Sequence, residues 1–225
     1  ALLGTPDPVS AWEQLVKAEE VVGIKSNAWY QLPTPRSLEA AIQGRLLQVG
    51  VKKENVSADD RGVLSNPVFQ RATALINTRP MRTHYWSGLG TLLKNYIMFT
   101  PRPSDYHDNA CENLGAIWLF PQVKGKTRLN ILVMLTPQFH GVGPHSYSPQ
   151  YIWPYGGLIV SRDPVAADAT GARIIEGAAT GIDPVARRVH IRGHESLAYD
   201  ALSIDTGITP DTREIALFFA ADELV

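Results

Sequence analysis

The sequence predicts an α/β protein with a mostly parallel or mixed central sheet flanked by helices. Short apolar runs of strand length, such as residues 131–135, alternate with segments whose apolar residues recur at helical spacing. Strands separated by helices are typical of βαβ units. We expect one domain over residues 1–225, with a core of about residues 21–176 and a turn-rich C-terminal part of residues 177–225.

The first third of the chain contains three predicted strands and the helices that connect them. Residues 10–20 have the pattern of a short amphipathic helix, and residues 21–27 that of a strand. A helix then opens at Pro35 and stops at Gly50, because glycine is favoured just past a last helical turn. Residues 55–58 and 74–78 are predicted strands, with a short helix over residues 66–73 between them.

The remaining elements follow a polar segment over residues 80–95, which we expect to form a turn and the start of a helix. We predict a helix over residues 108–120 and strands over residues 128–135 and 158–161. The helix over residues 163–176 has the clearest start, with Asp163 as its cap and Pro164 at its first position. A last strand is expected over residues 214–220.

Composition excludes several classes of function. The formal net charge is -1, from 21 basic and 22 acidic residues, so no overall field attracts nucleic acid or an anionic membrane. No stretch approaches the roughly 20 apolar residues that a membrane span needs. A single cysteine, Cys111, excludes a disulfide framework and a cysteine-ligated iron–sulfur cluster within this chain.

Polar residues follow several of the predicted strands, where ligands collect in parallel sheets. The candidates for such a site are Lys25, Asn27, Asp59, Asp60, Arg61, the segment from His84 to Asn95, and Asp163. We predict that they converge on a small anionic or carbonyl-bearing ligand.

His84 and Lys94 are the candidates for chemistry in the polar segment. His84 has the residue type of a general base or a metal ligand, with Lys25 and Lys94 as electrostatic partners; the alternative is a histidine satisfied by a backbone group. Gly88, Gly90 and Lys94 offer N–H groups and a cation to an anion, although their spacing does not match a P-loop. The alternative is a glycine-softened turn with a solvated lysine.

Asp168 is placed unusually for a carboxylate. Its neighbours three and four positions away on the predicted helix are all apolar residues or glycine, so it lies on the face expected to pack on the sheet. A carboxylate there needs a cation, several N–H donors or a metal. It is either a catalytic residue or a structural link between the helix and a loop.

A divalent metal is one candidate cofactor. The candidate ligands are His84, His107, His140 and His145, although no spacing among them matches a zinc signature. The aromatic loop that follows His145 suits a pocket mouth, a surface for a protein partner, or a loop folded back on the sheet. The Gly-x-Ser-x-Gly nucleophile elbow is absent, which argues against a standard α/β-hydrolase.

Several motifs together resemble the domain-of-unknown-function family 362. They are VGIKSN at residues 22–27, Asp60-Arg61, Arg82-Thr83-His84, GTLLKN at residues 90–95, Gly143-Pro144 and SRDPVAADATG at residues 161–171. The resemblance implies an α/β fold. It also implies an exported, periplasmic location, since many members resemble exported proteins and the N-terminus is short for the family; a cytoplasmic location is the alternative.

This sequence differs from the family pattern at two positions, and two hypotheses about its function follow from the motifs. The family pattern has a lysine at the position of Arg82 and an aspartate at that of Val133. The first hypothesis is an enzyme whose cations hold the ligand while His84 moves a proton and Asp60 and Asp168 orient the cations or a metal. The second is a non-catalytic accessory subunit of a larger assembly, with a degenerate site.

Overall fold

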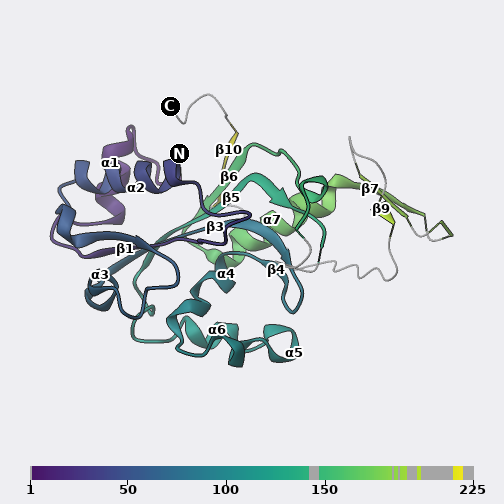
Figure 1. Cartoon of the computed structure of the whole chain (residues 1–225). Coiled ribbons are helices and arrows are strands. Elements are labelled where there is room, and N and C mark those ends of the chain that lie inside the picture. The colour runs from purple at the N-terminus through teal and green to yellow at the C-terminus, as the bar shows by residue number, and fades with distance from the viewer. Residues whose placement is uncertain are drawn as a thin grey trace.

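The computed structural model describes residues 2–141, 147–183, 185–186, 188–191, 197–198 and 215–219. In that part of the chain a seven-stranded sheet forms the centre of the molecule (Figure 1). Its strands are β1 (Val22–Lys25), β2 (Val56–Asp59), β3 (Ala74–His84), β4 (Gly88–Gly90), β5 (Thr127–Gln138), β6 (Gly157–Ser161) and β10 (Ile215–Phe219). They lie in the order β10-β6-β5-β3-β1-β2, and β4 pairs with β3.

The sheet is mixed, with a parallel centre. β1 is parallel to β2 and to β3, and β3 is parallel to β5, whereas β6 is antiparallel to β5 and β10 is antiparallel to β6. The predicted α/β class is therefore confirmed. No helix in the described ranges has the length and apolar character that a membrane span requires.

Helices cover both faces of the sheet (Figure 1). They are α1 (Pro8–Leu15), α2 (Arg36–Gln48), α3 (Pro67–Arg71), α4 (Leu92–Asn95), α5 (Asp108–Cys111), α6 (Leu114–Ile117) and α7 (Pro164–Ala178). The apolar stripe of α2, with Ile42 and Leu46, packs on Ile24 of β1 in one core cluster. On the other face, Phe69 of α3 and Ile117 of α6 pack beneath β3.

Helix α7 lies close against the sheet on the same face as α4, and it contacts α4, β5 and β6. Gly171 makes this approach possible, because a Cβ there would lie 2.6 Å from Leu132 Cδ2 and 2.9 Å from Met81 Sδ. The close packing brings the middle of α7 beside the start of α4.

The C-terminal part contains a second, three-stranded antiparallel sheet. It consists of β7 (Ala179–Asp183), β8 (Arg188–Ile191) and β9 (Leu197–Ala198). The sequence predicted only turns there, because the strands are short and their hairpin pairing is a tertiary feature. That residues 1–225 form one domain stays a prediction.

Two predicted elements differ from the structure. The segment from Pro80 to His84 continues β3 instead of forming a turn, because β5 and then β4 satisfy its backbone hydrogen bonds. The predicted helix over residues 108–120 is divided into α5 and α6, since Asn109, Ala110 and Cys111 have positive φ angles of 47°, 57° and 64°.

The strand order creates a crevice beside the end of β1. The chain passes from β1 to β2 on one side and later returns to place β3 on the other side. Ligands of open α/β sheets bind at such a switch point, outside the carboxyl ends of the strands. β1 ends at Lys25, while β3 continues for seven residues beyond Asn77, the partner of Lys25.

Candidate functional site

A row of polar side chains crosses the sheet at the end of β1. Lys25 pairs with Asn77, Asn77 with Asn130, and Asn130 with Ser161. Asn77 Nδ2 donates to Asn130 Oδ1 at 3.1 Å and to the carbonyl of Leu92 at 3.1 Å. The row therefore joins the sheet to α4.

Lys25 is fully buried and forms an ion pair with Asp60. Its Nζ donates to Asp60 Oδ1 at 2.5 Å, to the Ser26 carbonyl at 2.6 Å and to Asn95 Oδ1 at 3.3 Å. Burial lowers the pKa of Lys25 to about 8, and the charge of Asp60 opposes that shift. Burial also opposes ionisation of Asp60, but Lys25 and the Ala28 N–H hold its pKa below the usual value.

Asn95 fixes α4 against β1 and β3. Its Nδ2 lies within hydrogen-bonding distance of three acceptors: the Lys25 carbonyl at 3.1 Å, Asn77 Oδ1 at 2.9 Å and the Thr78 carbonyl at 3.1 Å. Because Lys94 precedes Asn95 on this short helix, the hydrogen bonds of the Asn95 side chain also fix the position of the Lys94 backbone.

Asp168 reaches from α7 to the start of α4. It accepts hydrogen bonds from the Thr91 hydroxyl at 2.7 Å, from the Leu92 N–H at 3.0 Å and from the Leu93 N–H at 2.9 Å. Burial raises the pKa of Asp168 to about 6, against the effect of these three hydrogen bonds and of the Arg79 charge. The carboxylate thus caps a helix that belongs to a different part of the chain.

Arg79 lies between the two carboxylates without pairing closely with either. Its side chain is 3 % exposed, and the charges of Asp60 and Asp168 both favour its ionised form. Burial is the stronger effect and lowers its pKa to about 10. Among the described residues no acceptor bonds its Nε. One of its terminal nitrogens lies so near Gly90 that a Cβ there would be 2.9 Å away.

Arg82 extends this positive charge toward the loop after β1. Its NH1 lies 3.4 Å from Asn27 Oδ1, and its guanidinium lies 4.2 Å from the centre of the Trp29 ring, a cation–π contact. Burial and the neighbouring Arg79 lower the pKa of Arg82 to about 8. Its Nε, like that of Arg79, has no hydrogen-bond partner within the described ranges.

His84 and Lys94 lie at the far end of this group. Lys94 is buried, its Nζ lies 3.6 Å from Cys111 Sγ, and burial lowers its pKa to about 8. Burial, followed by the charges of Lys94 and Arg79, lowers the pKa of His84 to about 3. The imidazole is therefore neutral at physiological pH.

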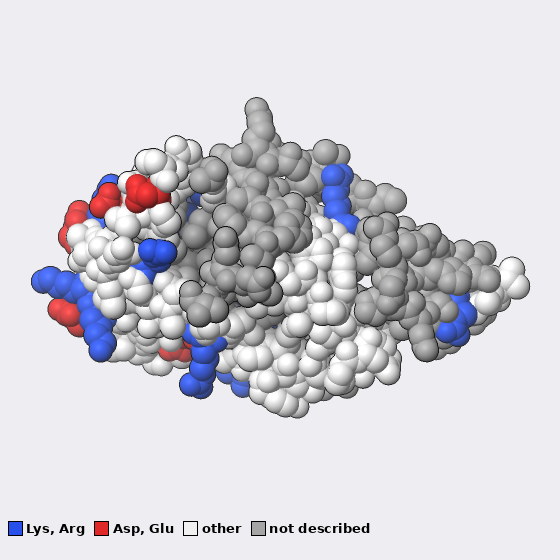
Figure 2. Space-filling view, turned by 90° about the horizontal axis from the view of Figure 1, so that it is seen from above, with Lys and Arg blue, Asp and Glu red and all other residues white. Residues whose placement is uncertain are grey.

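Together these side chains form a buried cationic cluster, which we define as Lys25, Arg79, Arg82 and Lys94. Asp60 and Asp168 are the buried carboxylates that face it, so the four buried cations outnumber the buried carboxylates by two. The part-buried Asp59 adds a smaller negative contribution at Lys25. This excess contrasts with the chain's net charge of -1. On the described part of the face in Figure 2, acidic side chains lie among basic ones toward one end, and further basic side chains are scattered elsewhere.

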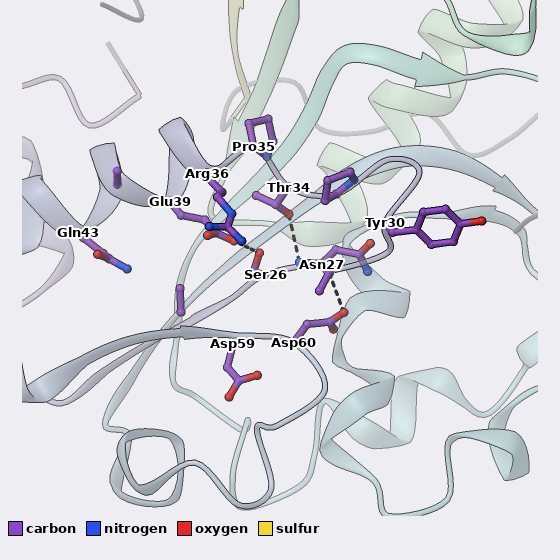
Figure 3. A pocket seen from close by; sticks show the side chains of 14 residues that line it. Ser26, Asn27, Tyr30, Thr34, Pro35, Arg36, Glu39, Gln43, Asp59 and Asp60 are labelled. Carbon is purple, nitrogen blue, oxygen red and sulfur yellow. Dashed lines mark hydrogen bonds between the residues drawn. The ribbon is translucent and has the colours of Figure 1, made fainter. Parts of the chain in front are cut away.

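A cleft of about 650 Å³ lies beside the cluster, between the loop after β1, the start of α2 and the end of β2 (Figure 3). Its polar lining includes Ser26, Arg36, Glu39 and Gln43, and Ser26 Oγ donates to Glu39 Oε1. The volume is within the usual range for small-molecule sites.

Comparison with known proteins assigns a family. The model of the domain of unknown function DUF362 matches residues 51–173, more than half of the chain. This chain belongs to the DUF362 family. No curated protein and no solved structure matches it. The match includes Asp60, Arg79, Arg82, Lys94 and Asp168, and β1 with Lys25 precedes it.

The DUF362 fold brings most of the predicted site residues together. Lys25, Asn27, Asp60, His84, Lys94, Asn95 and Asp168 are all buried at or beside the cluster. Arg61 is exposed. Asp163 follows β6, which is antiparallel to β5, so it does not lie at the carboxyl edge with the others; its Oδ1 instead accepts the N–H groups of Val165 and Ala166 at the start of α7.

The predicted metal ligands do not gather in the part of the DUF362 chain that the structure describes. No group of three His, Cys, Asp or Glu side chains there is arranged to hold a metal ion. The rings of His84 and His107 stack at 5.7 Å, while His140 packs against Tyr151 at 4.7 Å. His145 lies outside the described residues, and the metal assignment stays a prediction.

Arg79 and Arg82 are the cluster residues that were not among the predicted site residues. The predicted strand ended at Thr78, so Arg79 fell between a strand and a turn. Asn77, Arg79 and Met81 stand at every second position and so share one face of a buried strand, and this period of two was the available signal. Val133, where the family resemblance leads us to expect an aspartate, packs in the apolar core with Ile42 and Leu46 of α2.

Proposed function

We propose that this DUF362 protein binds a small molecule through a doubly charged anionic group, with phosphate as the best match, at the buried cationic cluster. One observation carries the proposal: Arg79, Arg82 and Lys94 are buried, and none forms an ion pair with a described carboxylate. Burying a cation without a counter-ion is costly, so stability alone does not account for three of them.

The number and kind of the cations support a phosphate group. A phosphate monoester carries nearly two negative charges at neutral pH, which would balance the excess of two buried cations over buried carboxylates. Guanidinium groups match the geometry of phosphate oxygens, and the Nε atoms of Arg79 and Arg82 are donors without acceptors among the described residues.

His84 adds a neutral donor to this set. The Ser87 N–H points at His84 Nδ1 at 3.4 Å, which assigns the imidazole proton to Nε2. A neutral imidazole with its proton on Nε2 can donate a hydrogen bond to an anion without adding charge. This role differs from the predicted proton transfer, which needs a histidine with a pKa nearer neutrality.

Isothermal titration with inorganic phosphate tests the proposal. We expect wild-type protein to bind phosphate, and Arg79→Met to weaken binding about 10- to 100-fold, since a hydrogen bond to a charged group contributes about 1.5–3 kcal/mol. Arg71→Met removes an exposed arginine of α3 and should leave the affinity unchanged.

The accessory-subunit hypothesis predicts a different result: none of the three proteins binds phosphate, and partner subunits co-purify with them.

Anion affinity should also depend on pH. Lys25, Arg82 and Lys94 have pKa values of about 8 in the free protein, and a bound anion raises them. The affinity is therefore highest well below pH 8 and falls as pH rises through 8 and the free cluster loses protons. Titration with sulfate, whose charge is constant, should give a dissociation constant that changes little near pH 7, between the titration of Asp168 at about 6 and that of the three cations, and a steady loss of affinity above pH 8. A constant affinity up to pH 10 would contradict the assignment.

A further inference from the structure

The cleft shown in Figure 3 is not part of the cluster that we propose as the phosphate site, yet two residues belong to the surroundings of both. Asn27 and Asp60 line the cleft. Asn27 Oδ1 is also the contact of Arg82, and Asp60 Oδ1 is the partner of Lys25. A ligand in the cleft could therefore contact Asn27 and Asp60, the residues that contact Arg82 and Lys25 of the cluster.

The lining of the cleft identifies the chemistry that it suits. The two aspartates on its floor are already engaged: Asp59 accepts from the Gly62 N–H and from Asn66 Nδ2, and Asp60 accepts from Lys25 and the Ala28 N–H. No hydrogen bond within the described residues engages the side chains of Arg36 and Gln43, which stand on α2 with Glu39.

These groups include both hydrogen-bond donors and acceptors. Arg36 offers only donors, Gln43 offers both, and the second carboxylate oxygen of Glu39 is an acceptor. Hydroxyl groups both donate and accept, so neighbouring hydroxyls satisfy such a set. Pro33 and Pro35 add apolar ring surfaces suited to carbon-bound hydrogens.

We propose that the cleft holds the hydroxylated part of the ligand whose phosphate enters the cluster, so that the ligand is a phosphorylated sugar or polyol. This inference rests on the proposed function. It predicts that the two parts bind more tightly when they are joined than phosphate binds alone, because the second contact becomes intramolecular.

Titrations with separate and joined probes test the inference. The probes are inorganic phosphate, ribose, ribose 5-phosphate, glucose 6-phosphate and glycerol 3-phosphate. We expect at least one of the three esters to bind at least tenfold more tightly than inorganic phosphate. The double variant Arg36→Ala/Gln43→Ala should remove that gain and leave the affinity for inorganic phosphate unchanged. Gln48→Ala, on the same helix outside the cleft, is the matched control and should retain the gain.

The outcomes separate the two proposals. Phosphate binding with no ester bound more tightly would overturn the cleft assignment and leave the anion site standing. An ester gain that persists in the double variant would also overturn it, since the hydroxylated part would then lie elsewhere. Absence of phosphate binding in wild-type protein would refute the anion site itself.

Discussion

Replacing Asp168 by alanine should lower the free energy of unfolding by about 3 kcal/mol or more. The substitution leaves the Thr91 hydroxyl and the N–H groups of Leu92 and Leu93 without their acceptor, and each unsatisfied buried donor costs about 1–3 kcal/mol. The start of α4 should loosen, and phosphate binding should weaken because Lys94 belongs to that helix. Urea denaturation followed by circular dichroism measures the change in stability.

Asp163→Ala is the matched control for this effect. Asp163 also accepts two backbone N–H groups, but it caps its own helix, α7, from a less buried position. Loss of an ordinary cap costs about 1 kcal/mol. If the two variants lose equal stability, Asp168 is an ordinary cap and the link between α7 and α4 is unimportant.

Replacing Asp60 by alanine should lower the free energy of unfolding by about 3–5 kcal/mol, the usual cost of removing one partner from a buried ion pair. The variant leaves Lys25 fully buried and without its counter-ion. The pair also joins the end of β1 to the loop after β2, so the effect should include local loosening at the cleft. Urea denaturation at pH 7, where Lys25 is charged, provides the measurement.

The double variant Lys25→Met/Asp60→Leu should recover much of the loss, because it leaves no unpaired charge. Asp105→Ala removes one partner of the exposed Arg102–Asp105 pair and should change stability by less than about 1 kcal/mol. If Asp60→Ala resembles that surface variant, Lys25 has found another counter-ion and the description of the pair is incorrect.

Local patterns were sufficient to predict the α/β class, most elements and several of the residues that the fold brings together at the cluster. Glycine after α2 and proline at the start of α7 place those helices to within a few residues. The apolar neighbours of Asp168 indicated correctly that it faces inward and needs donors. Lys25 was identified because it lies at the end of a predicted strand, and Lys94 because it is the cation that follows Gly88 and Gly90.

Tertiary pairing determines what the sequence did not reveal. Nothing local to residues 158–161 distinguishes a parallel strand from an antiparallel one, and Asp163 was misplaced for that reason. The continuation of β3 to His84 depends on β5, some fifty residues later, and it is this continuation that buries Arg79 beside the two carboxylates. The excess of positive charge becomes apparent only when side chains from β1, the loop after β2, β3, α4 and α7 are brought together.

The most direct test of the central claim, that the cluster is held for an anion and not for stability, is the stability of Lys94→Met with and without phosphate. Methionine has a similar length and no charge, and the structure offers the Lys94 ammonium only a thiol as partner among the described residues. We therefore predict that the free variant is at least as stable as wild type in urea, and that phosphate stabilises it much less than wild type. A variant that is clearly less stable than wild type and equally stabilised by phosphate would contradict the claim.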